Sequence, residues 1–98
     1  MTTTIDRMKD RLSVLQPERL EVDDDSALHA GHAGARSGGG HYNLLLVSPR
    51  FESKSTVARH RMIYDALGDM MGSAIHALAI RALSATEATK QLPNEEPR

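Results

Sequence analysis

The spacing of apolar residues changes along this 98-residue chain, and that change constrains the fold more than any other feature. Over residues 3–16 the apolar side chains recur every three or four positions, which is typical of an amphipathic helix. Thr3 is the predicted N-cap of this helix, and Pro17 ends it. Polar and apolar residues then alternate over residues 19–23, as expected for a strand with one buried face.

Two further strands and a second long helix are predicted in the rest of the chain. Residues 41–48 have an unbroken apolar centre, which favours a strand inside the sheet. Ser55 is the expected N-cap of a helix that reaches Met71, and Gly72 is the residue expected to end it. Residues 75–82 have the spacing of the third strand.

A short terminal helix completes the pattern, because Ser84 and Glu87 have the spacing of a capping box. The resulting order is helix, strand, strand, helix, strand, helix. It predicts an α+β fold, in which a hairpin and one helical crossover form a three-stranded mixed sheet with helices packed on one face. We expect a single domain over residues 1–91 and a disordered C-terminal tail over residues 92–98.

The composition argues against several classes of protein. Lys and Arg number 12 and Asp and Glu 13, and the resulting net charge of -1 is not that of a generally basic nucleic-acid binder. The chain has no cysteine, which excludes disulfides, cysteine-ligated zinc and a thiol nucleophile. No apolar run approaches the ~20 residues that span a bilayer, and the first residues do not have the pattern of a signal peptide. We therefore expect a cytoplasmic protein that is not bound to membranes.

Catalysis finds little support in the sequence. The nucleophile-elbow pattern Gly-x-Ser-x-Gly does not occur. The run of three glycines over residues 38–40 precedes a predicted strand, whereas a phosphate-binding loop leads into a helix. We expect that the protein is not an enzyme.

The five histidines are the unusual chemical resource of the chain. His29 and His32 lie in the segment 26–40, which holds five of the seven glycines and is expected to be mobile. Glycine neighbours let an imidazole approach a metal ion without crowding, but two solvated side chains would have the same pattern. His41 and His76 lie in predicted strands, where a hydrogen-bonded imidazole is the expected role.

His60 falls inside the apolar arc of the second long helix, between Leu67 and Met71 on the helical projection. The apolar residues of this arc are Val57, Ile63, Tyr64, Leu67, Met70 and Met71. It also lies near the beginning of that helix, where the positive end of the helix dipole disfavours an imidazolium. A neutral imidazole in this position can ligate a metal ion or donate one hydrogen bond within a core. Residue type alone favours the second role.

Basic residues cluster between residues 50 and 61, where four of them accompany a single acidic residue, giving a local charge of 4 − 1 = +3. At a turn and a helix N-terminus, they could contact the phosphates of a nucleic acid or the carboxylates of a partner protein. A solvated basic face without a function is the alternative. The four residues are Arg50, Lys54, Arg59 and Arg61.

Several segments of the chain resemble the BolA family in sequence, order and spacing, over roughly residues 5–88. The resemblance implies a class II KH-like fold with the order α-β-β-α-β and a further helix, in agreement with the order predicted from the apolar spacing. The matching segments are Leu20-Glu21-Val22, the His-Ala-Gly-His loop, Val47-Ser48 with Arg50-Phe51, Arg59-His60-Arg61-Met62-Ile63-Tyr64 and Ile75-His76-Ala77-Leu78-Ala79.

The resemblance implies a BolA-like adaptor that binds a monothiol glutaredoxin and shares a [2Fe-2S] cluster with it, in iron–sulfur cluster trafficking or iron regulation. It implies that His60 of the Arg-His-Arg motif is one ligand and that His32 of the loop is the second, with His29 as the alternative. A cysteine of the glutaredoxin and a glutathione would supply two thiolates. The two histidines would complete the coordination, because histidine can replace cysteine in such clusters. We expect the isolated chain to lack a cluster and to be a monomer or a weak homodimer.

The same resemblance implies an alternative function, a DNA-binding transcriptional regulator that would contact duplex DNA through the basic segment 50–61. Ser53 departs from the glycine often present in the family's Phe-x-Gly-x-Ser turn. The paired glycines with which KH domains approach a nucleic-acid backbone are also absent. Both departures weaken the case for a KH-type mode of nucleic-acid binding.

Overall fold

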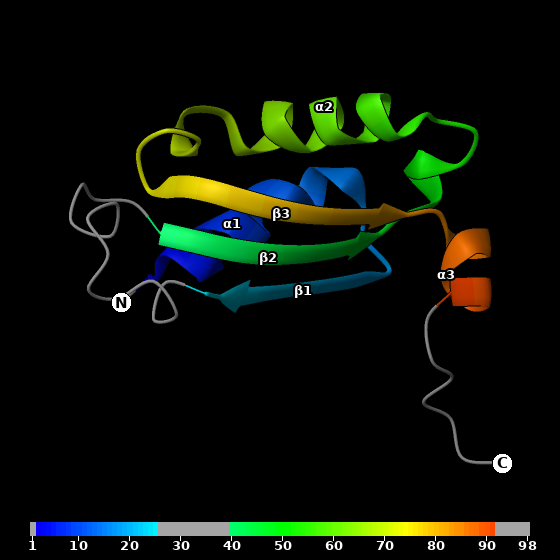
Figure 1. Ribbon diagram of the computed structural model, residues 1–98, viewed down its shortest axis with the longest axis horizontal. Helices are drawn as coiled ribbons and strands as arrows, with labels where there is room; N and C mark the ends of the chain where they lie inside the picture. The colour runs from blue at the N-terminus through cyan, green and yellow to red at the C-terminus, as the bar shows by residue number, and fades with distance from the viewer. Residues whose placement is uncertain (1, 26–39, 92–98) are drawn as a thin grey trace, which may run out of the picture.

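The computed structural model describes residues 2–25 and 40–91 (Figure 1). Each strand begins and ends within one residue of its predicted bounds, and the predicted order of elements is confirmed. The predicted tail and all but one residue of the predicted glycine-rich loop lie outside the described residues. The elements are α1 (Thr4–Leu12), β1 (Arg19–Asp24), β2 (Gly40–Val47), α2 (Thr56–Leu67), β3 (Ile75–Leu83) and α3 (Ala85–Gln91).

The three strands form one mixed sheet in the order β1-β2-β3. β1 and β2 are antiparallel, whereas β2 and β3 are parallel and are connected through α2. Figure 1 shows α1 and α2 on the same side of the sheet and α3 beyond the end of β3. The α+β fold with a three-stranded mixed sheet is therefore confirmed. No helix in the described part of the chain has the length and apolar character needed to cross a bilayer.

The hydrophobic core lies between the sheet and the two long helices. Every second residue of β2 points into it, because strand side chains alternate between the two faces of a sheet. Complete burial of a side chain of leucine size contributes about 1.5–3 kcal/mol. The buried core residues are Met8, Leu12, Leu15, Tyr42, Leu44, Leu46, Phe51, Ile63, Leu67, Met70 and Ile75.

The first helix begins at its predicted N-cap, Thr3, whose side chain forms a capping box with Asp6. Thr3 Oγ1 accepts a hydrogen bond from the backbone N–H of Asp6 at 3.0 Å, and the Asp6 carboxylate accepts one from the backbone of Thr3 at 3.2 Å. These two bonds satisfy backbone N–H groups that have no partner inside the helix.

The second long helix ends four residues earlier than predicted. Its C-cap is Gly68, with φ 56° and ψ -127°, rather than Gly72. Arg11 of α1 stabilises this end, since its Nη1 donates to the Leu67 carbonyl and to the Asp69 carboxylate, both at 2.7 Å. A contact from a residue 56 positions away in sequence therefore helps to fix the end of α2.

The buried face of α2 also differs from the predicted apolar arc. Val57 and Tyr64 are 66% and 43% exposed, so their predicted place on the buried face is wrong, whereas Ile63 and Leu67 of the same arc are buried as predicted. The buried residues of α2 are Arg59, Ile63 and Leu67, which are spaced four residues apart. An arginine thus occupies a buried position that the apolar pattern could not assign to it.

Candidate functional site

His60 lies near the beginning of α2 and is half-buried. Its imidazole meets the ring of Tyr64 edge-on, with the ring centroids 6.5 Å apart and the planes at 79°. The preceding residue, Arg59, donates from Nη1 to the Ala82 carbonyl at 3.0 Å. This turn of α2 therefore lies beside the carboxyl end of β3.

His41 and His76 come together at the opposite end of the sheet. They are near the first residues of β2 and β3, and these strands are parallel, so both imidazoles lie at the same sheet end. Their ring centroids are 5.2 Å apart and their planes are tilted by 42°. His41 is half-buried and His76 is exposed.

An irregularity in the strand pairing explains this contact. Gly40 pairs with Ile75 and His41 pairs with Ala77, so His76 is an additional residue between two pairs. Such a bulge redirects the side chain of the extra residue, and bulges are frequent next to functional sites. The histidine pair is therefore a product of the fold and not only of sequence spacing.

The histidine pair also lies where residues 26–39 join the sheet. The backbone N–H of Asp25 donates to the His41 carbonyl at 2.7 Å, and that of Gly40 donates to the Ala74 carbonyl at 3.0 Å. His29 and His32 belong to that segment and lie outside the described residues. Both attachment points of the segment are thus next to the histidine pair.

The structure does not bring His60 near these attachment points. Along β3, Ala82, which the turn carrying His60 contacts, lies six positions beyond His76. At ~3.3 Å per strand residue this separation is about 20 Å. The sequence alone assigns His41 and His76 to ordinary strand positions. Both histidines, however, come at the beginnings of two strands that are expected to be parallel, and this placement indicates that their side chains lie close together.

The donor set of this end of the sheet limits its chemistry. Among the residues that the structure describes, no group of three or more His, Asp or Glu side chains could hold a metal ion. A [2Fe-2S] cluster takes four ligands, most of them thiolates, and the chain has no cysteine. The exposed His76 imidazole can therefore serve as a nitrogen ligand only where another molecule supplies the sulfur, because the described residues alone do not form a complete site.

Three of the four predicted basic contact residues are exposed. Arg50, Lys54 and Arg61 lie in or after the turn between β2 and α2, on the solvent side. Arg50 donates from Nε to the side-chain oxygen of Gln16 at 3.2 Å. They form a basic corner, which we define as Arg50, Lys54 and Arg61.

Arg59 does not belong to this basic corner, because its guanidinium is engaged inside the fold. Only 8% of the residue is exposed. It donates to the carbonyls of Lys54 at 2.9 Å and Ala82 at 3.0 Å and to both carboxylate oxygens of Glu87, and it lies 5.9 Å from the ring centroid of Phe51. The prediction that Arg59 contacts a partner or a nucleic acid does not fit this position, and we do not retain it.

Comparisons with known proteins decide the family. The family profile described as BolA-like protein matches residues 12–87. The chain belongs to the BolA-like family. It is 46% identical over 87 residues to SufE-like protein 1, chloroplastic/mitochondrial, of Arabidopsis thaliana, covering 83% of this chain and 24% of that protein. It is 37% identical over 83 residues to the DNA-binding transcriptional regulator BolA of Escherichia coli, covering 84% of this chain and 76% of that protein.

Solved BolA structures share the fold. The structure of BolA1 from Arabidopsis thaliana has a TM-score of 0.75 and 34% identity, and the match covers 89% of this chain and 97% of that one. The chain spans 24%, 47% and 53% of the length of three curated relatives, all of them longer. BolA relatives are named as BolA-like proteins or regulators rather than as enzymes.

Proposed function

We propose that this BolA-like chain is a non-enzymatic adaptor that binds a monothiol glutaredoxin and shares a [2Fe-2S] cluster with it. Family membership and the absence of cysteine support the proposal. The observation that carries it is the His41–His76 pair at the sheet end where residues 26–39 are attached. The cluster is cargo, and the glutaredoxin cysteine and a glutathione supply its thiolates.

His76 is the proposed nitrogen ligand from the described residues, in place of His60. Its side chain is exposed, whereas His60 is half-buried against Tyr64 near the other end of the sheet. The second nitrogen comes from His32, with His29 as the alternative, since both belong to the segment attached beside His76.

The strand position of His76 suits this role. Ligands on strands are held more rigidly than ligands on loops, so β3 fixes one imidazole while the segment 26–39 brings the other. His41 contacts the His76 ring and is the positioning residue for it.

The experiment that tests this function is anaerobic reconstitution of the chain with a monothiol glutaredoxin and glutathione. Visible absorption and circular dichroism spectra are compared for the wild type and for His76→Ala, His41→Ala and His60→Ala. We expect His76→Ala to change the cluster spectrum, His41→Ala to change it less and His60→Ala to leave it unchanged. A changed spectrum in His60→Ala with an unchanged one in His76→Ala would reverse the assignment, and thermal melting shows that each variant is folded.

DNA binding is the second candidate function, and two observations favour it. A relative with 37% identity is named a DNA-binding transcriptional regulator. The basic corner is exposed at the N-terminal end of α2, where cations can meet phosphate oxygens. The contact residues proposed for this function are Arg50, Lys54 and Arg61, without Arg59.

A further inference from the structure

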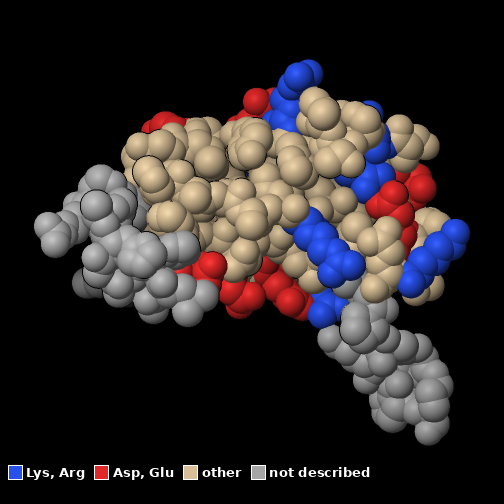
Figure 2. Space-filling model, in the orientation of Figure 1, with Lys and Arg blue, Asp and Glu red and all other residues tan. Residues whose placement is uncertain are grey.

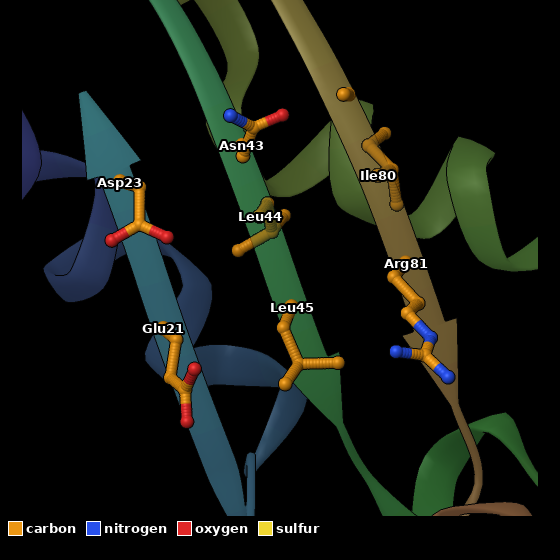
Figure 3. A pocket seen from close by; sticks show the side chains of 8 residues that line it. Glu21, Asp23, Asn43, Leu44, Leu45, Ile80 and Arg81 are labelled. Atoms are coloured by element: carbon orange, nitrogen blue, oxygen red, sulfur yellow. The ribbon is translucent and has the colours of Figure 1, made fainter. Parts of the chain in front are cut away.

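The face of the sheet that points away from α1 and α2 is open in the described part of the chain (Figure 1). Two depressions of about 260 Å³ each lie on it, and both are lined by Asn43 and Ala79. Because they share these residues, the two depressions are adjacent along the strands, and together we call them the open groove. Figure 3 shows the side chains of Glu21, Asp23 and Arg81 around it.

The strand register arranges the open groove in three rows across the sheet. Each row has an acidic residue of β1 or, in the case of Asp25, of the position directly after it, then a floor residue of β2 and a wall residue of β3. Successive rows are two residues apart, which corresponds to about 6.7 Å along the strands. The rows are Glu21–Leu45–Arg81, Asp23–Asn43–Ala79 and Asp25–His41–Ala77.

The two walls of the open groove differ in charge and in size. A carboxylate stands in every row on the β1 side, and Figure 2 shows acidic side chains along this lower edge of the molecule. The β3 side has two alanines and a single basic residue, Arg81. Glu21 pairs with Arg19 at 2.6 Å, but the side chains of Asp23 and Arg81 make no hydrogen bond or ion pair with any described residue.

We propose that the open groove docks an amphipathic helix of a partner protein that carries Lys or Arg at every fourth position. Helix residues four apart are separated by about 6 Å along the axis, close to the spacing of the carboxylate rows. The cations of such a helix meet Asp23 and its neighbours in the acidic wall, and Ala77 and Ala79 leave room for the helix to lie on the sheet. An extended peptide fits less well, because its backbone N–H and C=O groups would be unpaired over a sheet face.

The test uses the full chain and two synthetic 18-residue helical peptides of Ala and Leu, one with Lys and one with Glu at every fourth position. Amide chemical shifts of the ¹⁵N-labelled chain are followed during titration. We expect the Lys peptide to shift Asn43, Leu45 and Ala79, to bind more weakly as salt is added and to bind more tightly than the Glu peptide.

Three variants separate docking in the open groove from general attraction. Asp23→Asn combined with Asp25→Asn is expected to weaken binding of the Lys peptide by about two- to fivefold, as for exposed ion pairs. Ala79→Gln fills the groove without changing charge and is expected to weaken binding as well. Asp65→Asn removes an exposed carboxylate from α2 and is the matched control, with unchanged binding expected.

Four outcomes would overturn the proposal. These are no binding of the Lys peptide, equal binding of both peptides, shifts confined to α2, and a loss of affinity in Asp65→Asn as large as that in the double variant. The other possible occupant is a second copy of the chain, and sedimentation tests for it. Self-association that Ala79→Gln abolishes, without binding of the Lys peptide, would assign the open groove to that second copy. The proposal does not depend on cluster sharing, so either can fail alone.

Discussion

The guanidinium of Arg59 donates hydrogen bonds to both oxygens of the Glu87 carboxylate and so ties α2 to α3. The same guanidinium binds the carbonyls of Lys54 and Ala82, at 2.9 and 3.0 Å. Glu87 also accepts from the backbone N–H of Ser84 at 3.0 Å, within the capping box of α3. One ion pair thereby joins the beginning of α2, the end of β3 and the terminal helix.

Replacement of Arg59 by alanine should destabilise the fold. Arg59→Ala leaves the carbonyls of Lys54 and Ala82 without this donor and removes the partner of Glu87. Hydrogen bonds of a charged group are worth about 1.5–3 kcal/mol, and we expect a loss of about 2 kcal/mol in the free energy of unfolding. Urea denaturation measures it, with the exposed Arg61→Ala as the control. Equal, small effects of the two variants would contradict a structural role for Arg59.

The stabilisation by Glu87 should depend on pH. The hydrogen bond from Arg59, and then that from the Ser84 backbone, lower the pKa of Glu87 to about 2 from its ordinary value of 4.5. A pKa that is depressed in the folded state stabilises the fold above the unfolded value, and this stabilisation is lost as the pH falls through the folded value. We expect the wild type to exceed Glu87→Gln in stability at neutral pH, and the difference to shrink between pH 4.5 and about 2. A difference that stays constant over this range would show that ionisation of Glu87 has no part in it.

Gly40 should not tolerate a side chain, because the Tyr42 ring occupies the space beside it. A Cβ at this position would lie 2.6 Å from a ring carbon of Tyr42, and that ring is buried. We expect Gly40→Ala to lower the free energy of unfolding by about 1–3 kcal/mol, as for overpacked core positions. In a Tyr42→Leu background the same substitution should cost less, and a double-mutant cycle measures the coupling. Additive costs would mean that the ring is not the obstacle.

The DNA-binding alternative makes its own prediction. Affinity for duplex DNA should fall steeply with salt and should drop in Lys54→Ala and Arg61→Ala, because phosphate contacts release counterions. Arg81→Ala, on the open sheet face, is the matched control and should leave the affinity unchanged. Gel retardation at several salt concentrations provides the measurement. Absence of retardation at low salt would rule out this function for the basic corner.

The elements and the sheet could be predicted from the sequence because they depend on local spacing. Strands show either alternating polar and apolar residues or a continuous apolar run. The caps at Thr3 and Ser84 are short-range hydrogen bonds that the residue types predict. The end of α2 could not be predicted in the same way. It depends on Arg11, which reaches the Leu67 carbonyl from α1.

The site was harder to predict because it depends on tertiary contacts. A buried guanidinium such as that of Arg59 has no signature in a hydropathy pattern, since its partners come from three other segments. The contact between His41 and His76 requires the parallel pairing and the irregularity at Gly40, which no local pattern specifies. His60 was favoured by its motif, and only the fold shows that it lies near the other end of the sheet.

Pulsed electron paramagnetic resonance of the reduced, shared cluster tests the central claim most directly. The chain is labelled with ¹⁵N in its histidines and assembled with an unlabelled glutaredoxin and glutathione. Our proposal predicts a ¹⁵N coupling typical of directly bound imidazole, which is reduced or lost in His76→Ala and retained in His60→Ala. Absence of any ¹⁵N coupling in the wild-type complex, or its loss only in His60→Ala, would contradict it.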